Sequence, residues 1–322
     1  MESFLNIPTS PSASLTAAAA AAAGHQQYPA GTLYVVATPI GNLADLSLRA
    51  IHLLGLVDAV ACEDTRVSAQ LLRWLGLHKP LIALHQHNEQ QAAEGLVSRL
   101  LNGERIAYVS DAGTPAISDP GALLVAAAAK AGVRVVPLPG ASSAAAALSV
   151  AGDTRAQGFR FVGFLPTKAA ERRAALQALT GAPHSQVLFE APHRIHELVA
   201  LLAELAPTQT LTLCREVTKQ FETIHTAPCA TLPAWMAEDK QRERGEFVLV
   251  LHAAEAPSSA EGLPADALRT LRVLVRDLPL KQAAALAAEL TGESRKALYQ
   301  QALDWKQDSA AGGDDDTDGG DR

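Results

Sequence analysis

The chain has 322 residues, of which 48% are hydrophobic, so it is long enough to bury a core and to form two domains or slightly more. No run of 18 or more strongly apolar residues occurs in the sequence, and a membrane span is therefore not expected. The three cysteines, Cys62, Cys214 and Cys229, form no CxxC pair. We expect neither a disulfide framework nor a cysteine zinc site, and this cysteine usage fits a cytoplasmic location.

The two ends of the sequence differ from its middle. Residues 1–31 contain an alanine tract and lack the basic start of a secretory signal, so we predict a disordered extension, with a lone alanine helix as the alternative. Residues 307–322 are predicted to be an acidic disordered tail. The last ten residues, GDDDTDGGDR, carry a net charge of −4 out of −7 for the whole chain. The acidity is thus largely confined to this tail, and a local basic face for nucleic acid remains open.

From residue 32 to residue 150, short apolar runs alternate with amphipathic segments. This alternation predicts an α/β domain with a largely parallel sheet and crossover helices. The expected strands are 33–37, 59–62, 81–84, 105–109 and 133–136, and the expected helices are 47–54, 66–75, 89–101 and 120–130.

The polar stretch 151–157 indicates a linker, after which a second α/β domain with mixed strand pairing is predicted over residues 158–252. A loop rich in Pro, Ser and Ala then leads to a small helical domain over residues 264–306. The expected strands of the second domain are 159–164, 186–189, 210–215 and 246–251, and the expected helices are 168–179, 193–205 and one near Trp235.

The sequence SDAGTPAISDPG, from Ser110 to Gly121, follows an expected strand and precedes an expected helix. Open α/β sheets bind their ligands at such strand-to-helix turns. The glycines allow close backbone approach and the prolines stiffen the loop, so it suits a polar organic ligand. It suits a triphosphate poorly, because it contains no lysine and no GxxxxGK[ST] motif. An ordinary Gly/Pro/Asp turn is the alternative.

Other loops that follow strands also carry unusual residues. They are TPIGNL (38–43), EDTR (63–66), LPGASS (138–143), EAPHR (190–194) and REVTK (215–219). We expect them to gather at one edge of the two sheets, with the domains facing each other over a cleft. Helix capping is the alternative for the acids of EDTR and for the serines of LPGASS.

His85 and His87 share a strand face, but no cysteine or spaced acid completes a zinc site, so we predict no metal.

Taken in order, these segments resemble one known family. The segments are ATPIGNLADLSLRA, CEDTRVSAQLL, VSDAGTPAISDPG, PLPGASSAAAAL, FVGFLP, FEAPHRI and REVTKQFE, and the match as a whole runs from about residue 32 to residue 251. They resemble the ribosomal RNA small subunit methyltransferase I family of the tetrapyrrole methylase superfamily. The segment LPLKQAAALAAELTG is similar to that family's small C-terminal domain.

The resemblance implies a two-domain α/β tetrapyrrole methylase (class III methyltransferase) fold with a small C-terminal helical domain, acting as a homodimer. It implies 2′-O-methylation of a cytidine ribose in small-subunit (16S) ribosomal RNA, with S-adenosylmethionine as the methyl donor. The donor would lie in the interdomain cleft. By the family pattern, the residues expected to contact it are Pro39, Asp111, Ala112, Gly113, Ile117, Ser118, Ser142, Ser143, Phe189 and Glu190.

Methyl transfer to a ribose hydroxyl is helped by a positioned base or by a cation that lowers the hydroxyl's pKa. The REVTK loop supplies three candidates for this role, Arg215, Glu216 and Lys219. A solvated lysine beside a structural ion pair is the alternative. His193 and Arg194 are candidate substrate contacts. Three arginines spaced to share one helix face form the candidate RNA surface; they are Arg269, Arg272 and Arg276.

Two other functions are compatible with the same resemblance. One is a precorrin-type tetrapyrrole C-methyltransferase. Three features argue against this function: the TPIGN loop, the REVTK segment and the helical C-terminal region. The other is a noncatalytic RNA-binding assembly factor that has kept the fold. Incubation with labelled S-adenosylmethionine would distinguish the three functions. Label in RNA indicates the rRNA methyltransferase, label in a macrocycle indicates the tetrapyrrole methyltransferase, and label in neither indicates the noncatalytic factor.

Overall fold

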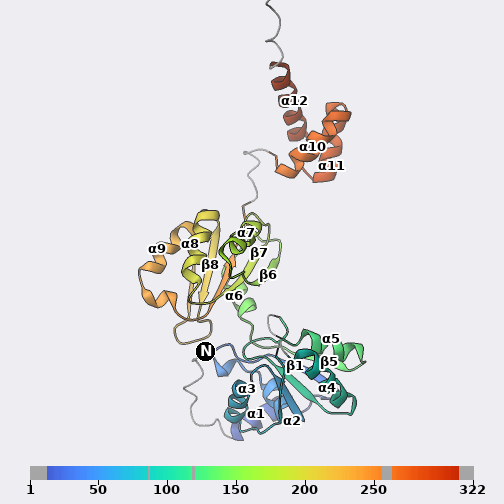
Figure 1. The fold of residues 1–322 in the computed structure, drawn as a ribbon, viewed down its shortest axis with the longest axis vertical. Helices are drawn as coiled ribbons and strands as arrows, with labels where there is room; N and C mark the ends of the chain where they lie inside the picture. Colours follow the sequence, from blue (N-terminus) through green and yellow to red (C-terminus); the bar gives the residue numbers. More distant parts are fainter. Residues whose placement is uncertain (1–12, 86–87, 118–119, 256–262, 312–322) are drawn as a thin grey trace, which may run out of the picture. The chain divides into compact units, whose positions relative to one another are not determined.

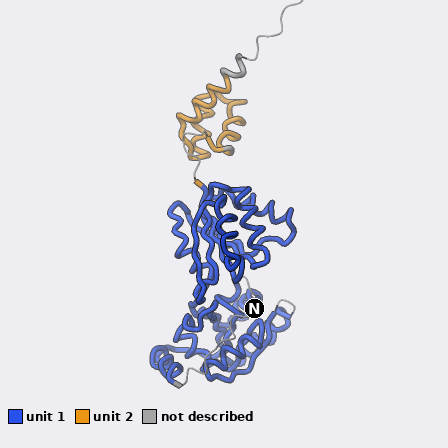
Figure 2. The backbone as a smooth tube through the Cα atoms, turned by 90° about the vertical axis from the view of Figure 1, so that its left-hand side faces the viewer, with its two compact units in different colours: residues 1–254 blue, residues 255–322 orange. Residues whose placement is uncertain are grey.

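The computed structural model describes residues 13–85, 88–117, 120–255 and 263–311. The chain divides into two compact units, Met1–Ala254 and Glu255–Arg322 (Figure 2). None of the helices within the described ranges has the length and hydrophobicity needed to cross a bilayer. The α/β architecture with a helical C-terminal unit confirms the predicted fold class (Figure 1).

The first sheet is parallel, in the order β3-β2-β4-β1-β5. Parallel neighbours need crossover connections, which the alternating helices provide. Apolar residues cover both of its faces, as is usual for buried parallel strands, and two hydrophobic clusters result. The strands are β1 (Thr32–Val36), β2 (Ala59–Cys62), β3 (Leu81–Ala83), β4 (Ile106–Val109) and β5 (Arg134–Leu138), and the helices are α2 (Leu48–Leu56), α3 (Thr65–Trp74), α4 (Glu89–Leu101) and α5 (Ala122–Lys130).

The alanine tract near the N-terminus forms helix α1 (Ala13–Ala23), so the predicted disorder is wrong for this segment. Ala19 and Ala23 are buried, and Ala19 joins the core cluster that includes residues of α2. The Tyr28 hydroxyl donates to the carbonyl oxygen of Ala23 (3.2 Å), and the Tyr28 ring lies 5.3 Å from that of His52. Tertiary packing thus adds to the high helix propensity of alanine. Residues 1–12 lie outside the described residues.

The second sheet is mixed, as predicted, in the order β6-β7-β10-β8-β9. β6 and β7 are parallel, whereas β10 runs antiparallel to both β7 and β8. The segment after β8, where the sequence predicted no strand, forms an antiparallel edge strand. The strands are β6 (Phe159–Phe164), β7 (Ser185–Glu190), β8 (Thr210–Arg215), β9 (Thr223–Pro228) and β10 (Phe247–Leu251). The helices are α7 (Ala169–Leu179), α8 (Ile195–Leu205) and α9 (Leu232–Ala237), with 3-10 turns at Leu43–Asp45, Cys229–Thr231 and Lys240–Glu243.

Helix α6 (Ser143–Ala151) differs from its predicted place. The sequence assigns residues up to 150 to the first domain, but α6 packs on β8 and β10 of the second sheet. Its buried residues Ala147 and Ala151 join Val187, Cys214 and Val250 in one apolar cluster. The small alanine side chains let the helix lie close to the sheet, a tertiary contact that local sequence does not reveal.

The C-terminal unit contains α10 (Ala265–Asp277), α11 (Leu280–Thr291) and α12 (Arg295–Ala311). Small residues such as Ala283 and Ala287 pack with Leu271 and Leu298 in its core. Helix α12 extends into the segment predicted to be a disordered tail, so that prediction is wrong for residues 307–311. The acidic residues that follow lie outside the described residues.

Candidate functional site

The loops after β1 and β4 are joined at the carboxyl end of the first sheet. Thr38 N donates to Gly113 O (2.9 Å), and Gly113 N donates to Thr38 O (3.1 Å). The buried Thr38 hydroxyl also donates to Ser110 O (3.1 Å). Because parallel strands end at the same edge, the TPIGNL and SDAGTP loops meet there, as the sequence predicts.

Glycines allow these loops to pack closely. Gly113 has φ +81°, in the left-handed region that favours glycine. At Gly140, after β5, a Cβ would lie 2.9 Å from the Cβ of Ala37, so a larger residue would push the two loops apart. The Thr114 hydroxyl donates to Ala141 O (3.1 Å) and ties the β4 and β5 loops together. Thr114 lies inside the SDAGTP motif, but sequence reasoning did not select it.

Six of the predicted cofactor residues line one hollow, here called the Phe189 hollow. The hollow is open to solvent, has a volume of about 380 Å³ and is bordered by Phe189 from β7 of the second sheet. Ile117 is 55% exposed, so its apolar side chain is accessible to a ligand. Ser142 also caps α6, with its Oγ accepting from Ala145 N (3.4 Å). The hollow is lined by Ala112, Gly113, Thr114, Ile117, Ser142, Ser143, Ala144 and Phe189.

Pro39 and Asp111 instead line a neighbouring hollow, here called the Asp111 pocket, together with Thr38 and Ser110. Helix α3 forms its other side through Val67, Ser68, Gln70 and Leu71, and Leu43 completes the lining. Eight of the ten predicted cofactor residues therefore divide between two adjacent hollows beside the same loop. Ser118 lies outside the described residues.

Asp111 connects this edge to the EDTR segment. Its Oδ1 accepts from Asp64 N (3.0 Å), and burial raises the pKa of its carboxyl. Asp64 caps α3 by accepting from Arg66 N (2.8 Å), which agrees with the capping alternative. Hydrogen bonds from the Arg66 side chain and backbone lower the pKa of Asp64 to about 2. These acids therefore hold the loop geometry beside the pocket.

Glu190 is buried and lies in the lining of neither hollow. Its Oε1 accepts from Ala191 N (2.9 Å) and lies 3.2 Å from Arg194 Nε, while no partner for Oε2 is found within the described part of the chain. The Arg194 guanidinium also donates to Leu165 O (2.9 Å) and Pro166 O (3.1 Å). The Arg194 guanidinium is thus fixed by contacts within the chain, whereas the His193 side chain is exposed to solvent. Substrate contact by either residue stays a prediction.

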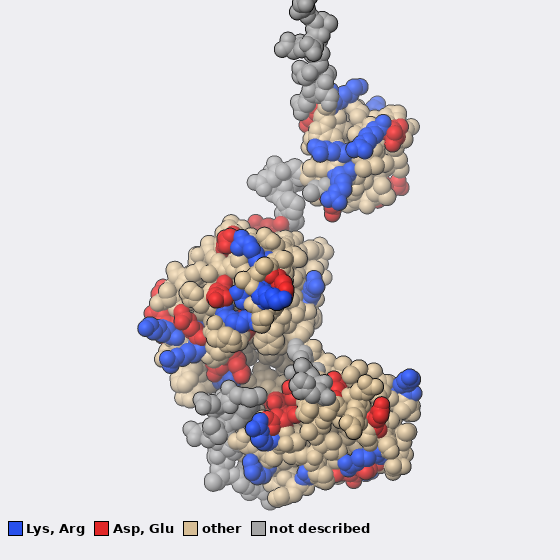
Figure 3. All heavy atoms as spheres, in the orientation of Figure 1, with Lys and Arg blue, Asp and Glu red and all other residues tan. Residues whose placement is uncertain are grey.

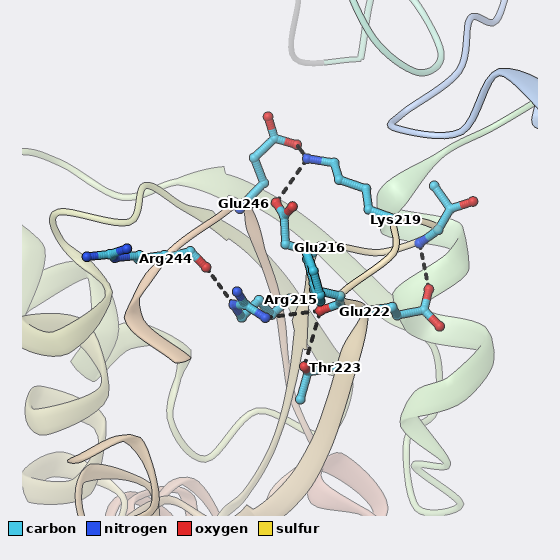
Figure 4. A network of polar contacts seen from close by, with 9 residues as sticks. Arg215, Glu216, Lys219, Glu222, Thr223, Arg244 and Glu246 are labelled. Carbon is cyan, nitrogen blue, oxygen red and sulfur yellow. Dashed lines mark hydrogen bonds and ion pairs between the residues drawn. The ribbon is translucent and has the colours of Figure 1, made fainter. Parts of the chain in front are cut away.

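The loop after β8 holds Lys219 in a polar cluster (Figure 4). Lys219 Nζ donates to Glu216 Oε1 and to Glu246 Oε2, each at 2.9 Å. Glu216 Oε1 also accepts from Glu246 N (2.9 Å). Glu216 has φ +52°, and a Cβ at Gly245 would lie 2.6 Å from its Cγ, so the loop packs tightly. Glu246, which sequence reasoning missed, precedes β10 and had no motif to mark it.

This cluster contacts the loop after β1. A Cβ on Gly41 would lie 2.5 Å from Lys219 Cγ, so the lysine stem lies directly over this glycine. The Thr218 hydroxyl donates to the carboxylate of Asp45. The TPIGNL and REVTK loops, far apart in sequence, therefore meet as the strand-end prediction requires.

The charges of the cluster are fixed by its hydrogen bonds. Burial works to lower the pKa of Lys219, but the hydrogen bonds to Glu246 and Glu216 raise it above its usual value. Burial works to raise the pKa of Glu216, but hydrogen bonds from Glu246 N and Lys219 hold it below its usual value. At neutral pH the pair is therefore a cation and a carboxylate. Lys219 suits the role of a cation near the reacting oxygen and not that of a base.

Arg215 differs from the other two catalytic candidates. Its side chain is largely buried, with Nε donating to Arg244 O (2.5 Å) and Nη1 donating to Phe221 O (3.0 Å). These bonds hold the β8–β9 connection to the segment before β10. These partners are backbone carbonyls, and among the described residues no ion pair joins Arg215 to Glu216 as the structural alternative proposed. A catalytic role for Arg215 stays a prediction.

The three arginines of α10, Arg269, Arg272 and Arg276, are all exposed. Arg269 lies 4.0 Å from Asp266, and the Arg272 guanidinium lies over the Trp305 ring at 4.9 Å. Figure 3 shows Lys and Arg side chains gathered on the visible face of the C-terminal unit. Among the described residues no group of three His, Cys, Asp or Glu is arranged to hold a metal, and His87 lies outside them.

The first lobe, with its parallel sheet, and the second, with its mixed sheet, define the tetrapyrrole methylase class. A model of the Tetrapyrrole (Corrin/Porphyrin) Methylases matches residues 32–233, and one of the RsmI C-terminal HTH domain matches residues 261–306. A crystal structure of diphthine synthase has a TM-score of 0.51 at 15% identity, covering 69% of this chain and 90% of that one, and thus shares the fold.

Full-length relatives narrow the class to one family. The chain is 50% identical over 275 residues to "Ribosomal RNA small subunit methyltransferase I" of Escherichia coli O157:H7, covering 85% of this chain and 95% of that one. It is 48% identical over 276 residues to the protein of the same name from Neisseria meningitidis serogroup B, covering 86% and 94%. The chain belongs to the ribosomal RNA small subunit methyltransferase I family.

Proposed function

We propose that this chain transfers a methyl group from S-adenosylmethionine to the ribose 2′-oxygen of a cytidine in 16S ribosomal RNA. The observation that carries the proposal is that about half of the aligned residues are identical to those of rRNA small subunit methyltransferases, over nearly the whole length of those relatives. Methylation of small-subunit rRNA is the activity for which those relatives are named. That name does not specify the nucleotide or the atom that is methylated, so the cytidine and its 2′-oxygen belong to our proposal.

The residues around the Phe189 hollow fit the donor chemically. Ile117 and Phe189 offer apolar surface for the adenine, and Ser142 and Ser143 offer hydroxyls for polar groups. Gly113 itself is buried and its backbone groups are bonded to Thr38, whereas the neighbouring Ala112 is exposed and accessible to a ligand. Asp111 and Pro39 border the adjoining pocket, and the carboxylate of Asp111 suits a cationic ligand.

Bound S-adenosylmethionine supplies an activated methyl group, so the protein has to align the reactants and stabilise charge. Lys219 remains protonated at neutral pH, because Glu216 and Glu246 stabilise its charge. Its ammonium favours the ionised form of a nearby hydroxyl. Glu216 holds the ammonium in place and orients the loop through Glu246 N. We assign Lys219 the electrostatic role and Glu216 a positioning role.

RNA recognition is assigned to the exposed arginines of α10, because such side chains can neutralise phosphates. The chain is further proposed to act in the cytoplasm as a homodimer. Phe159 and Phe164, which are 63% and 61% exposed on the edge strand β6, support self-association, since apolar residues of this size favour burial. Light scattering of the purified protein tests the homodimer, and a monomeric mass at micromolar concentration would refute it.

The proposed activity is tested with methyl-labelled S-adenosylmethionine and small subunits that lack the modification. The expected product is 16S rRNA labelled at one cytidine, with a ribose that resists alkaline cleavage at its 3′ side. Base labelling would overturn the 2′-oxygen assignment. Absence of label in RNA, with label in a precorrin substrate, would replace the proposal by the tetrapyrrole alternative.

A further inference from the structure

We propose that an open groove in the C-terminal unit binds a single-stranded RNA segment by stacking a base on its aromatic side chains. This inference rests on the proposed function and identifies a contact that the arginines of α10 do not provide. The groove, here called the Trp305 groove, lies between the α10–α11 turn and α12. It is lined by Val275, Leu278, Pro279, Leu280, Lys281, Tyr299, Ala302, Trp305 and Lys306.

The groove has the chemistry of a nucleotide site. It is open to solvent, with leucine and proline side chains along one side. Tyr299 and Trp305 lie six residues apart on α12 and are only partly buried. Aromatic rings of this kind provide a stacking surface for bases.

Positive charge surrounds the aromatic rings. Lys281 and Lys306 line the groove and are exposed, and no acidic residue belongs to the lining. Among the described residues neither lysine takes part in an ion pair. The guanidinium of Arg272 lies over the Trp305 ring and adds a third cation. Two lysines beside aromatic rings are complementary to phosphates that flank a stacked base.

The local charge favours RNA over an apolar peptide. Residues 263–306 contain seven basic and five acidic side chains, a net charge of +2 in a chain of net charge −7. A duplex would present its bases edge-on in a groove, whereas a single strand can place an unstacked base against a ring. Single-stranded RNA is therefore the occupant that uses both the rings and the lysines.

Tryptophan fluorescence tests the stacking directly. The chain has three tryptophans, so the Trp74→Phe/Trp235→Phe variant of the full chain leaves Trp305 as the single emitter. Titration with a 12-nucleotide oligouridylate is expected to quench this emission, and a 12-base-pair RNA duplex is expected to quench it less. Circular dichroism and a thermal melt check that the variant is folded. Emission that does not change at saturating oligonucleotide would overturn the proposal.

The lysines are tested by the salt dependence of binding to the same oligonucleotide. Lys281→Gln/Lys306→Gln removes two phosphate contacts, and the slope of log Kd against log salt is expected to fall by about 1.4. The control Lys130→Gln/Lys240→Gln changes the net charge equally at exposed positions of the other unit and should leave the slope near that of the wild type. Equal slopes for the two variants would overturn the proposal.

A last comparison separates RNA from protein as the occupant. Trp305→Leu should weaken oligonucleotide binding at least tenfold, with intact small subunits bound more weakly as well. Weaker subunit binding with unchanged oligonucleotide binding would assign the groove to a ribosomal protein and overturn the RNA proposal. These measurements need no methyl donor. Quenching without methyl transfer would thus count against the proposed activity alone, and methyl transfer without quenching would count against the groove alone.

Discussion

Replacing Gly113 by alanine should disturb donor binding more than it disturbs the fold. Gly113 has φ +81°, where an L-residue costs about 1–2 kcal/mol. Its new Cβ would lie 3.3 Å from Ile40 Cγ2, so that side chain or the loop has to move by a few tenths of an ångström. The two backbone hydrogen bonds with Thr38 resist this movement, so strain is transmitted to the loop that borders both hollows.

Gly132 supplies a matched control. It has φ +76°, close to that of Gly113, and no atom lies within 4 Å of the place that a Cβ would occupy there. Gly132→Ala and Gly113→Ala therefore share the backbone cost and differ in the contact at the site. Both should lower the Tm of the α/β unit by about 2–8 °C. Donor affinity should fall at least tenfold, about 1.4 kcal/mol, in Gly113→Ala alone.

Differential scanning calorimetry measures the Tm, and titration calorimetry with S-adenosylhomocysteine measures the affinity of the site. Wild-type affinity in a folded Gly113→Ala protein would refute the placement of the donor beside this loop. An equal loss of affinity in Gly132→Ala would show that the effect comes from general destabilisation and would refute the reasoning as well.

Three further outcomes are expected. Lys219→Met should lower kcat by about 10²–10³-fold with little change in donor Kd, since it removes a charge that acts on the reacting oxygen; the same loss in Lys240→Met would contradict this. Asp64 should titrate at about 2 by carboxyl NMR, so its stabilising effect is present above its unfolded pKa and is lost as the pH falls toward 2; a midpoint near 3.8 in the wild type would disprove the Arg66 contact. Glutamate at all three arginines of α10 should weaken subunit binding and leave donor affinity intact, and unchanged subunit binding would reject that surface.

Much of the fold follows from local pattern. The strand at 159–164 and the helix at 89–101 occur at their predicted bounds, because each is an uninterrupted apolar or amphipathic run between turn residues. The gathering of strand-end loops follows from parallel topology. Gly41 and Gly140 then mark places where those loops pass closely.

Tertiary contacts were harder to predict. An alanine run such as Ala13–Ala23 has no polar face to show which side is buried, so its packing on α2 was missed. Helix α6 is also alanine-rich and lacks a polar face, so its packing on the second sheet was not predicted. Glu246 belongs to no motif and reaches Lys219 only because β10 pairs with β8. Pro39 and Asp111 line the Asp111 pocket and not the Phe189 hollow. This depends on where their side chains lie, which the spacing of residues in the sequence does not encode.

The most direct test of the central claim is a crystal structure of the protein with S-adenosylhomocysteine. We expect the bound molecule to contact the loop around Gly113 and the side chains of Ile117 and Phe189. Electron density for the ligand at a site remote from these residues would contradict the account.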